Sequence, residues 1–365
     1  MFLIVTRNFP PELGGIQSLM GGLSENLLNH GPVKVFTYEF PNSDTYDNKS
    51  PIKIERIKGI KIFRKFRKAN LVNDFINTNS NIRALIADHW KSLELIKTEN
   101  LKKIKTFCLL HSKEINHELG SSTNRRIIKS TNNANFIISN SNYTKELAIR
   151  VGLDSSKIKI IFPGIDKPHK LDNLDIVKAE KFFGDSFPKI ITVSRLDKRK
   201  GHDKILMLIK NLKPKFPKIK YVSVGSGKEE DSLLHLRKEL GLENEVSFLK
   251  NIDYNFKASL IAKSNLFLMP SRIEKKSVEG FGISFLEAAS YGVASIGGKD
   301  GGASDAIVDK KTGLICDGND LNSIYKSVIN FFENKNYLNY GKNAKEFSEK
   351  FHWDKVVKNY LKLIN

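Results

Sequence analysis

The chain has 365 residues, a length that fits about two or three domains. Hydrophobic residues make up 40% of it and aromatic residues 10%, which is enough for real cores and excludes a wholly disordered chain. No apolar run approaches the roughly 20 residues of a membrane span. The N-terminus lacks a signal-peptide pattern, and the two cysteines make neither a zinc site nor a disulfide framework. We therefore expect a soluble cytoplasmic protein.

The charge is strongly basic, with 60 basic residues, 40 acidic residues and a net charge of +20. Lysine supplies 48 of the basic residues, so a generally lysine-coated surface is one interpretation. The other is attraction to a polyanion such as nucleic acid, anionic lipid or a phosphorylated substrate. A nucleic-acid binder should show a known binding motif or exposed stacking aromatic residues. We find neither in the sequence and expect no nucleic-acid partner.

The first half of the chain alternates strands and helices. After the strand Phe2–Thr6 comes a loop with two prolines and two glycines, and then apolar residues at helical spacing up to Leu27. This order is that of a βαβ unit with a glycine pair at the helix start. Further strands are predicted at Val33–Tyr38, Ala84–Ala87, Thr106–Leu110 and Phe136–Ser139.

A second series follows a polar linker with a flanking helix at about 166–188. Its predicted strands are Ile190–Ser194, Tyr221–Val224, Val246–Leu249, Leu266–Met269 and Val293–Ile296. Strands that alternate with helices indicate parallel sheets. We therefore expect an α/β protein of two Rossmann-like, doubly wound domains, 1–165 and 187–350, which face each other across a cleft. Ligands of such sheets bind beyond the carboxyl ends of the strands.

The segment 278–288 carries the strongest site pattern. A helix should begin near Gly282, where free N–H groups suit a phosphate, and Gly280 and Gly282 let the backbone approach a ligand. Glu279 precedes this helix and Glu287 lies about a turn and a half inside it. Both carboxylates could accept hydrogen bonds from sugar hydroxyls. The alternative is an ordinary glycine-bearing turn with a solvated glutamate.

A second pattern follows the strand Ile190–Ser194. Arg195 stands at its carboxyl end, and Lys200 lies in the loop before the next helix. Two cations that converge there can neutralise a leaving diphosphate, and the alternative is a charged loop. Because loop charges are usually solvated, we expect removal of either one to change stability by less than about 0.5 kcal/mol.

Histidines and a glycine pair mark further strand ends. His111 follows the strand Thr106–Leu110, where it could position a substrate or transfer a proton. A single histidine is more often structural, and the same holds for His89, between Asp88 and Trp90. Gly301-Gly302 could bring backbone to a ligand or merely form a turn.

Taken in order, these segments resemble the family 4 retaining glycosyltransferases of the GT-B fold. The resembling segments are Phe9–Gln17, Ser139–Thr144, Ile161–Asp166, Arg195 with Lys200-Gly201, and the glutamates Glu279 and Glu287 with seven residues between them. Residues 269–283 and 301–306 resemble the phosphatidylinositol mannosyltransferase type, which uses GDP-mannose. The stretch His111-Ser112-Lys113-Glu114 departs from the commoner His-Gly-His-Glu pattern.

The resemblance implies a retaining, metal-independent hexosyltransferase without a cofactor. Its substrates would be a nucleotide sugar, GDP-mannose first among them, and a lipid or glycan acceptor in glycolipid or cell-surface polysaccharide synthesis. The alternative is a UDP-sugar transferred to a diacylglycerol or lipopolysaccharide acceptor. Residues 187–350 would bind the donor and residues 1–165 the acceptor, with the helix 351–365 packed back on the first domain.

The resemblance also implies roles for single residues. Arg195 and Lys200 would hold the diphosphate, Glu279 would contact the donor sugar, and Glu287 would bind the ribose. His111 would contact the sugar and orient the acceptor. Backbone of the glycine loop and of the helix start would complete the donor site, at Gly14, Gly15, Gly280, Phe281, Gly282 and Ile283.

The segment 53–68 holds eight basic residues against one acidic residue, with isoleucine and phenylalanine between them. Part of it fits an ordinary edge strand with solvated lysines. The alternative is a face that docks on an anionic membrane, where each basic residue adds about 1 kcal/mol. The second interpretation predicts a peripheral protein at the inner face of the cytoplasmic membrane, held by Lys61, Arg64, Lys65 and Lys68.

Three other functions compete with glycosyl transfer. A nicotinamide-linked oxidoreductase needs Gly-x-Gly-x-x-Gly directly after the first strand, and here a longer loop leads to a bare glycine pair. A non-catalytic relative is disfavoured because Arg195, Lys200, Glu279 and Glu287 are all present. A non-enzymatic polyanion-binding protein remains the remote alternative.

Overall fold

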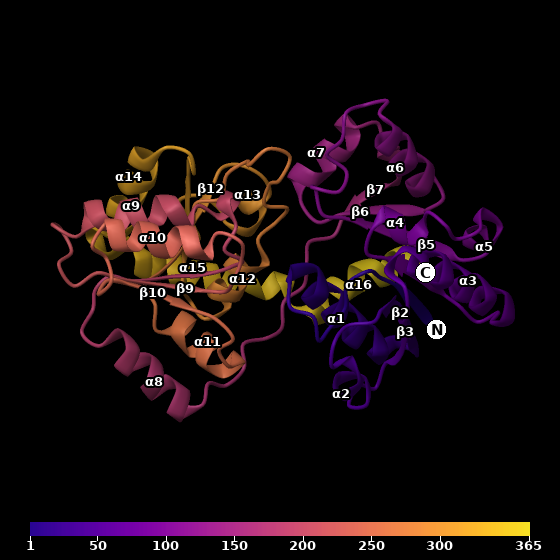
Figure 1. Ribbon diagram of the computed structural model, residues 1–365, viewed down its shortest axis with the longest axis horizontal. Coiled ribbons are helices and arrows are strands. Elements are labelled where there is room, and N and C mark those ends of the chain that lie inside the picture. Colours follow the sequence, from indigo (N-terminus) through magenta and orange to yellow (C-terminus); the bar gives the residue numbers. More distant parts are fainter. The chain divides into compact units, whose positions relative to one another are not determined.

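The computed structural model describes residues 1–365 apart from the side chain of Asn334. It divides into two units, one of Met1–Asp166 with Phe351–Asn365 and one of Lys167–Lys350 (Figure 1). Each unit contains one parallel β-sheet. The strand pairings are parallel throughout both sheets, which is the arrangement that alternating strands and helices predict.

The sheet of the first unit has seven strands in the order β3-β2-β1-β4-β5-β6-β7. The strands are β1 Phe2–Val5, β2 Val33–Tyr38, β3 Lys53–Ile57, β4 Ala84–Ala87, β5 Lys105–Leu110, β6 Phe136–Ser139 and β7 Ile158–Ile160. In β1, Leu3 and Val5 enter one apolar cluster while Phe2 and Ile4 enter another. Successive side chains point to opposite faces, and both faces are covered, so the strand is apolar at every position.

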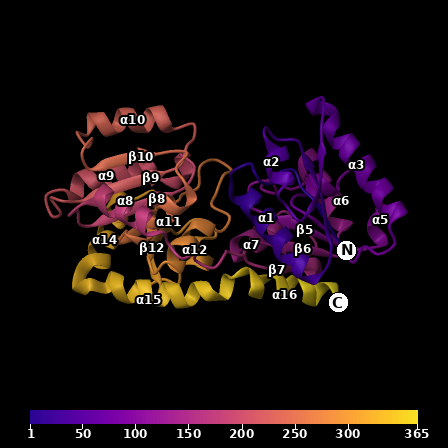
Figure 2. The ribbon, with the colours of Figure 1, turned by 90° about the horizontal axis from the view of Figure 1, so that it is seen from below.

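Two sets of helices cover these faces. The cluster of Leu3 draws residues from α3 Lys61–Thr78, α4 Trp90–Leu93, α5 Thr98–Lys102, α6 Ser122–Asn132 and α7 Asn142–Arg150. The cluster of Phe2 draws residues from α1 Gly15–Leu27, from α16 Trp353–Ile364 and, through Tyr46, from the short α2 Ser43–Asp47. Figure 2 shows α16 running beside α1.

The last helix is part of the core of the first unit because Trp353 fills a space that two glycines leave open. A Cβ atom on Gly22 would lie 2.4 Å from Nε1 of Trp353, and one on Gly164 would lie 2.3 Å from its Cδ2. Trp353 is 5% exposed, and Val356, Val357 and Tyr360 continue the buried stripe along the helix.

The sheet of the second unit has six strands in the order β10-β9-β8-β11-β12-β13. The strands are β8 Lys189–Val193, β9 Lys220–Val224, β10 Val246–Leu249, β11 Leu266–Met269, β12 Ser295–Gly298 and β13 Gly313–Cys316. The helices are α8 Asn173–Phe183, α9 His202–Leu212, α10 Glu230–Glu239, α11 Tyr254–Ala262, α12 Ile283–Ser290, α13 Ala303–Ala306, α14 Leu321–Phe332 and α15 Asn336–Ser348.

Most predicted strands agree with the structure to within a residue, but one is displaced. The sequence predicted Val293–Ile296, whereas β12 spans Ser295–Gly298. The strand includes two glycines, which local propensity disfavours. Close packing requires them: a Cβ atom on Gly298 would lie 1.7 Å from the backbone oxygen of Ser271 in the turn after β11, and one on Gly297 would lie 2.7 Å from Cδ1 of Ile307.

Two short strands, β7 and β13, were not predicted. Neither shows a continuous apolar run of four residues, because β7 has the exposed Lys159 at its centre and β13 begins at Gly313. Among the helices described, none is both long enough and apolar enough to pass through a bilayer.

Candidate active site

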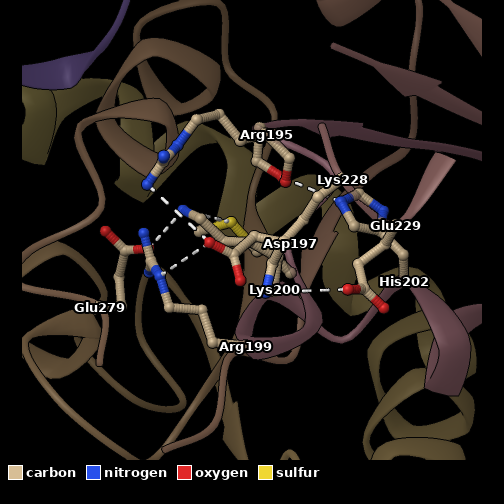
Figure 3. Close-up of polar contacts among 10 residues, drawn as sticks. Arg195, Asp197, Arg199, Lys200, His202, Lys228, Glu229 and Glu279 are labelled. Atoms are coloured by element: carbon tan, nitrogen blue, oxygen red, sulfur yellow. Dashed lines mark hydrogen bonds and ion pairs between the residues drawn. The ribbon is translucent and has the colours of Figure 1, made fainter. Parts of the chain in front are cut away.

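A buried carboxylate between two cations forms the centre of the site in the second unit (Figure 3). Nη1 of Arg199 donates to Oε2 of Glu279 at 2.7 Å, and Nζ of Lys200 donates to the same oxygen. All three side chains are buried, and Nζ of Lys200 also lies 3.4 Å from Sδ of Met269. Residues about 80 positions apart in the chain therefore meet in one cluster.

The electrostatics of this cluster favour an anionic ligand. Burial alone would raise the pKa of Glu279, but Lys200 and Arg199 outweigh it and lower that pKa to about 2, so the carboxylate is ionised. Burial lowers the pKa of Lys200, against the attraction of Glu279. One carboxylate shared by two buried cations leaves an excess of positive charge, which a bound anion would compensate.

Arg195 lies at the exposed side of this cluster. Its Nη2 is 3.9 Å from Oδ2 of Asp197, and its side chain is 69% exposed. The same carboxylate oxygen of Asp197 lies 4.0 Å from Nε of Arg199. Three cations thus share two carboxylates, and the guanidinium with the greatest exposure is the one a ligand can reach.

Tight backbone packing holds the cation-bearing loop in place. Gly201 adopts φ 79°, and a Cβ atom there would lie 2.6 Å from the backbone oxygen of Pro270. The backbone N–H of Arg272 donates to the oxygen of Arg199 at 2.8 Å. Both nitrogens of the Arg272 guanidinium fork bind Asp203, at 3.0 and 2.8 Å. The loops after β8 and β11 are therefore fixed to each other and to the start of α9.

A buried chain of hydrogen bonds also holds the loop between β8 and α9 in place. Nε2 of His202 lies 3.0 Å from Oγ of Ser194, and its Nδ1 lies 3.0 Å from the hydroxyl of Tyr221. That hydroxyl donates to Oγ1 of Thr192 at 3.0 Å. Burial lowers the pKa of His202 to about 4, so the imidazole is neutral at pH 7 and its role here is structural.

α12 begins at Ile283, shortly after Glu279 and next to Gly282, as the sequence predicted. Gly282 adopts φ 91°, and a Cβ atom there would lie 2.5 Å from the Phe285 ring. No side chain of the described residues caps this helix, so its first N–H groups can face a ligand. The N–H of Gly302 donates to the backbone oxygen of Glu279 at 2.9 Å, so the pair Gly301-Gly302 supports the site as a turn.

The other residues expected in the donor site are more dispersed. Glu287 lies half-buried within α12, and among the described residues no hydrogen bond or ion pair joins its side chain to the Glu279 cluster. Gly14 and Gly15 lie in the first unit at the start of α1, where a Cβ on Gly15 would meet open space.

His111 also lies in the first unit, directly after β5. Nε2 of its ring is 2.8 Å from the backbone oxygen of Asp88. Its backbone N–H donates to Oε1 of Glu114 at 2.6 Å. His89 is structural: its Nδ1 accepts from the N–H of Lys91 at the start of α4, and burial lowers its pKa to about 2.

The departure at Ser112 has a structural explanation. This residue adopts φ 85°, a left-handed conformation in which glycine is the usual residue. Its side chain is fully buried, and its Oγ lies 2.5 Å from Oγ1 of Thr144. The hydrogen bond offsets the backbone strain, so a serine can occupy a position where the resembling family commonly has glycine.

Two expectations from the sequence are wrong. Lys68 does not belong to an exposed basic face: it is 3% exposed and its Nζ donates to the backbone oxygen of Thr6 at 2.7 Å. Lys200 is not a solvated loop charge, because it is 7% exposed and paired with Glu279. The sequence also missed Arg199, whose only signal was its place beside Lys200 in a run of three basic residues.

The remaining basic segment splits into an edge strand and a helix. β3 at the edge of the sheet takes Lys53–Ile57, as one interpretation of the sequence expected, and α3 begins at Lys61. Lys61 and Lys65 are exposed on α3, while Arg64 is half-buried and lies 3.9 Å from Glu39. In the part of the chain that the structure describes, no group of three or more His, Cys, Asp or Glu side chains is arranged to hold a metal ion.

Comparison with known families identifies the chain. Residues 13–167 match the model of Glycosyltransferase Family 4, and residues 175–347 match that of Glycosyl transferases group 1. The chain belongs to the family 4 glycosyltransferases. The resemblance that the sequence motifs indicated is therefore confirmed.

Relatives of known activity span most of the chain. A GDP-mannose-dependent α-(1-6)-phosphatidylinositol monomannoside mannosyltransferase of Mycolicibacterium smegmatis is 25% identical over 344 residues, which cover 89% of this chain and 87% of that protein. An N-acetyl-α-D-glucosaminyl L-malate synthase of Bacillus anthracis is 30% identical over 236 residues, which cover 58% of this chain and 60% of that protein.

Solved structures share the fold. HepE of Anabaena in complex with UDP has a TM-score of 0.82 at 19% identity and covers 99% of both chains. Sucrose-phosphate synthase of Thermosynechococcus elongatus has a TM-score of 0.80 at 19% identity, covering 99% of this chain and 97% of that one. The predicted α/β, GT-B fold class is confirmed.

Proposed function

We propose that this glycosyltransferase is a retaining, metal-independent enzyme that moves mannose from GDP-mannose to a lipid or glycan acceptor at an anionic membrane surface. The observation that carries the proposal is the ionised Glu279 held by Arg199 and Lys200, beside the uncapped start of α12 and the exposed Arg195. In this arrangement a carboxylate that can accept hydrogen bonds from sugar hydroxyls lies beside groups that can donate hydrogen bonds to a diphosphate.

The charges suit the chemistry of glycosyl transfer. In the proposed reaction the bond between the anomeric carbon and a diphosphate oxygen breaks, a bond to an acceptor oxygen forms on the same face, and the acceptor proton passes to the leaving diphosphate. Negative charge grows on the leaving oxygen, and Arg195, Lys200 and the first N–H groups of α12 stabilise it without a metal ion. Glu279, with a pKa of about 2, accepts hydrogen bonds from the sugar and does not serve as a proton donor.

The choice of donor rests on the relatives. The mannosyltransferases of Mycolicibacterium smegmatis and Mycobacterium tuberculosis, both named as dependent on GDP-mannose, match along 89% of this chain. The alternative is a UDP-sugar, since HepE was solved with UDP and with UDP-glucose. For His111, Gly14 and Gly15, which lie in the first unit, the proposal keeps the substrate contacts that the family resemblance implies.

A thermal-shift panel of nucleotides and sugar nucleotides tests the donor. A ligand at 100 times its dissociation constant stabilises the fold by about 2.7 kcal/mol, and we expect GDP-mannose to exceed UDP-glucose. Arg195→Ala should lower turnover at least a hundredfold, by analogy with other charge-stabilising donors, without a large change in stability because the side chain is exposed. Lys198→Ala removes an exposed charge from the same loop and serves as the control. Absence of any stabilisation by nucleotide sugars would refute the proposal.

The proposed membrane contact rests on the first turns of α3. Ile62 is 72% exposed, and Phe63 and Phe66 are about half exposed, at 55% and 47%. The exposed Lys61 directly precedes these apolar residues, and the exposed Lys65 lies between Phe63 and Phe66. A helix that presents apolar and basic side chains together is typical of binding in the plane of a membrane interface.

Vesicle binding tests this contact. Wild-type protein should bind phosphatidylglycerol vesicles, with binding that falls as salt rises. The double variant Phe63→Ser/Phe66→Ser and the charge reversal Lys61→Glu/Lys65→Glu should each weaken it. Leu174→Ser removes a side chain of the second unit that is 70% exposed and is the control. If all variants bind the vesicles as well as the wild type does, α3 is not the membrane contact. The net charge of +20 is then explained by a generally lysine-coated surface.

A further inference from the structure

Three cations gather at the carboxyl ends of the strands in the first unit. Arg7 follows β1, Lys91 lies at the start of α4 after β4, and Lys68 reaches this edge from α3. We call these three residues the Arg7 cluster. No step proposed above uses them.

Lys68 forms the base of the Arg7 cluster. Besides its hydrogen bond to the oxygen of Thr6, its Nζ lies 4.2 Å from the centre of the Tyr38 ring. Among the residues that the structure describes, no carboxylate forms an ion pair with it. A buried ammonium without a carboxylate partner is costly, and burial lowers the pKa of Lys68 to about 8.

Arg7 lies at the centre of the cluster. Burial is the main cause of the lowered pKa values of Lys68, His89 and Lys91, and the charge of Arg7 lowers each of them further. The backbone places Arg7 beside these residues: its N–H donates to Oδ2 of Asp88, the neighbour of His89, and the residue before it, Thr6, accepts from Lys68. Arg7 is half-buried, and Lys91 is exposed, so a ligand can enter from solvent.

The positive charge of the Arg7 cluster is not matched. Two other cations near this edge have carboxylate partners: Arg56 binds both oxygens of Asp47, at 2.7 and 2.9 Å, and Arg64 lies near Glu39. The carboxylate that acts on Lys68 is that of Asp88. Its oxygens are engaged by the backbone N–H of Arg7 at 3.0 Å and by the hydroxyl of Ser92 at 2.7 Å.

Glu94 also attracts Lys91 but is paired with Arg126 at 2.6 and 3.1 Å, so the three cations and Asp88 leave a local charge of about +2. A phosphate monoester dianion would neutralise this charge and a phosphodiester monoanion would halve it. We propose that the Arg7 cluster binds a phosphate group of the acceptor, so that the acceptor is a phosphorylated sugar or a phospholipid headgroup. That this phosphate belongs to the acceptor substrate rests on the proposed function. That the Arg7 cluster binds a phosphate group does not depend on it. The phosphate would hold the acceptor at the strand ends where His111 also lies.

Binding of small phosphates to the full chain tests the proposal. At constant ionic strength, glycerol 3-phosphate should raise the melting temperature of the wild-type protein and glycerol should not. Arg7→Gln and Lys91→Gln should each weaken its affinity at least tenfold, as the loss of a charge-assisted hydrogen bond does. Glycerophosphoglycerol distinguishes the source: tighter binding than glycerol 3-phosphate indicates a diester lipid headgroup, and weaker binding indicates a phosphorylated sugar.

Matched controls separate this site from general charge. Lys53→Gln and Arg125→Gln remove exposed cations elsewhere in the same unit and should bind glycerol 3-phosphate like the wild type. Lys68→Met removes the buried charge itself. We expect that variant to be at least as stable as the wild type without ligand, and to lose the stabilisation by phosphate.

Two results would overturn the proposal. One is glycerol 3-phosphate binding that is absent from the wild type or unchanged in Arg7→Gln and Lys91→Gln. The other is an equal loss of GDP-mannose binding in these variants, which would assign the cluster to the donor diphosphate. Failure of the proposed function looks different, because a wild type that binds glycerol 3-phosphate but no nucleotide sugar would keep the phosphate site and lose the donor site.

Discussion

Replacing Glu279 by glutamine should destabilise the second unit and increase its affinity for anions. The change keeps the shape of the side chain but leaves Arg199 and Lys200 buried without a carboxylate. The pKa of Glu279 lies at about 2 against an ordinary 4.5, a difference worth about 3 kcal/mol at about 1.4 kcal/mol per pH unit. Removing one partner of a buried ion pair costs about 3–5 kcal/mol, which agrees with that value.

Urea unfolding provides the assay. Both tryptophans, Trp90 and Trp353, lie in the first unit, so tryptophan fluorescence reports on that unit while circular dichroism reports on both. With a slope of about 3 kcal/mol per molar urea, Glu279→Gln should lower the dichroism midpoint of the second unit by about 1 M. Glu287→Gln makes the same chemical change at a half-buried position of α12 outside the ion-pair cluster and is the matched control.

Pyrophosphate supplies a second readout. The variant leaves three cations with one carboxylate, so pyrophosphate should stabilise Glu279→Gln more than the wild type. If Glu279→Gln unfolds at the same urea concentration as Glu287→Gln and gains nothing from pyrophosphate, the argument from a buried ion pair is refuted.

Three other expectations follow from the same structure. The folded-state pKa of Glu279 lies below its unfolded value. The stabilisation that its carboxylate provides is therefore complete above about pH 5 and is lost as the pH falls towards 2. Across this range the free energy of unfolding of the wild type should fall by about 3 kcal/mol more than that of Glu279→Gln. Ser112→Ala loses the hydrogen bond to Thr144 but keeps the strained Cβ, whereas Ser112→Gly relieves strain worth about 1–2 kcal/mol. The glycine variant should therefore have the higher melting temperature, and the reverse order would disprove the strain. Gly164→Ala places a Cβ 2.3 Å from the ring of Trp353 and should cost about 1–3 kcal/mol; a red shift of the fluorescence maximum should accompany it, and an unshifted spectrum would contradict the packing.

The sequence by itself determined the alternation of elements and the loops that carry charge. Strands buried on both faces are apolar at every position, so β1, β4 and β11 could be read directly from the chain. Arg195 and Glu279 could be placed because each lies next to a local signal: Arg195 follows a strand end, and Glu279 precedes a glycine-rich helix start.

The tertiary structure decided which of these groups meet and which are buried. The pairing of Lys200 and Arg199 with Glu279 joins positions about 80 residues apart, and no local period encodes such a contact. In the sequence Lys68 could not be told apart from the exposed lysines around it. Its burial comes from the strand end at Thr6 that packs against α3, and nothing in its own segment shows this contact. The two glycines of β12 have a similar cause: Gly298 is limited by its distance to Ser271 and Gly297 by its distance to Ile307, and only the assembled unit sets these distances.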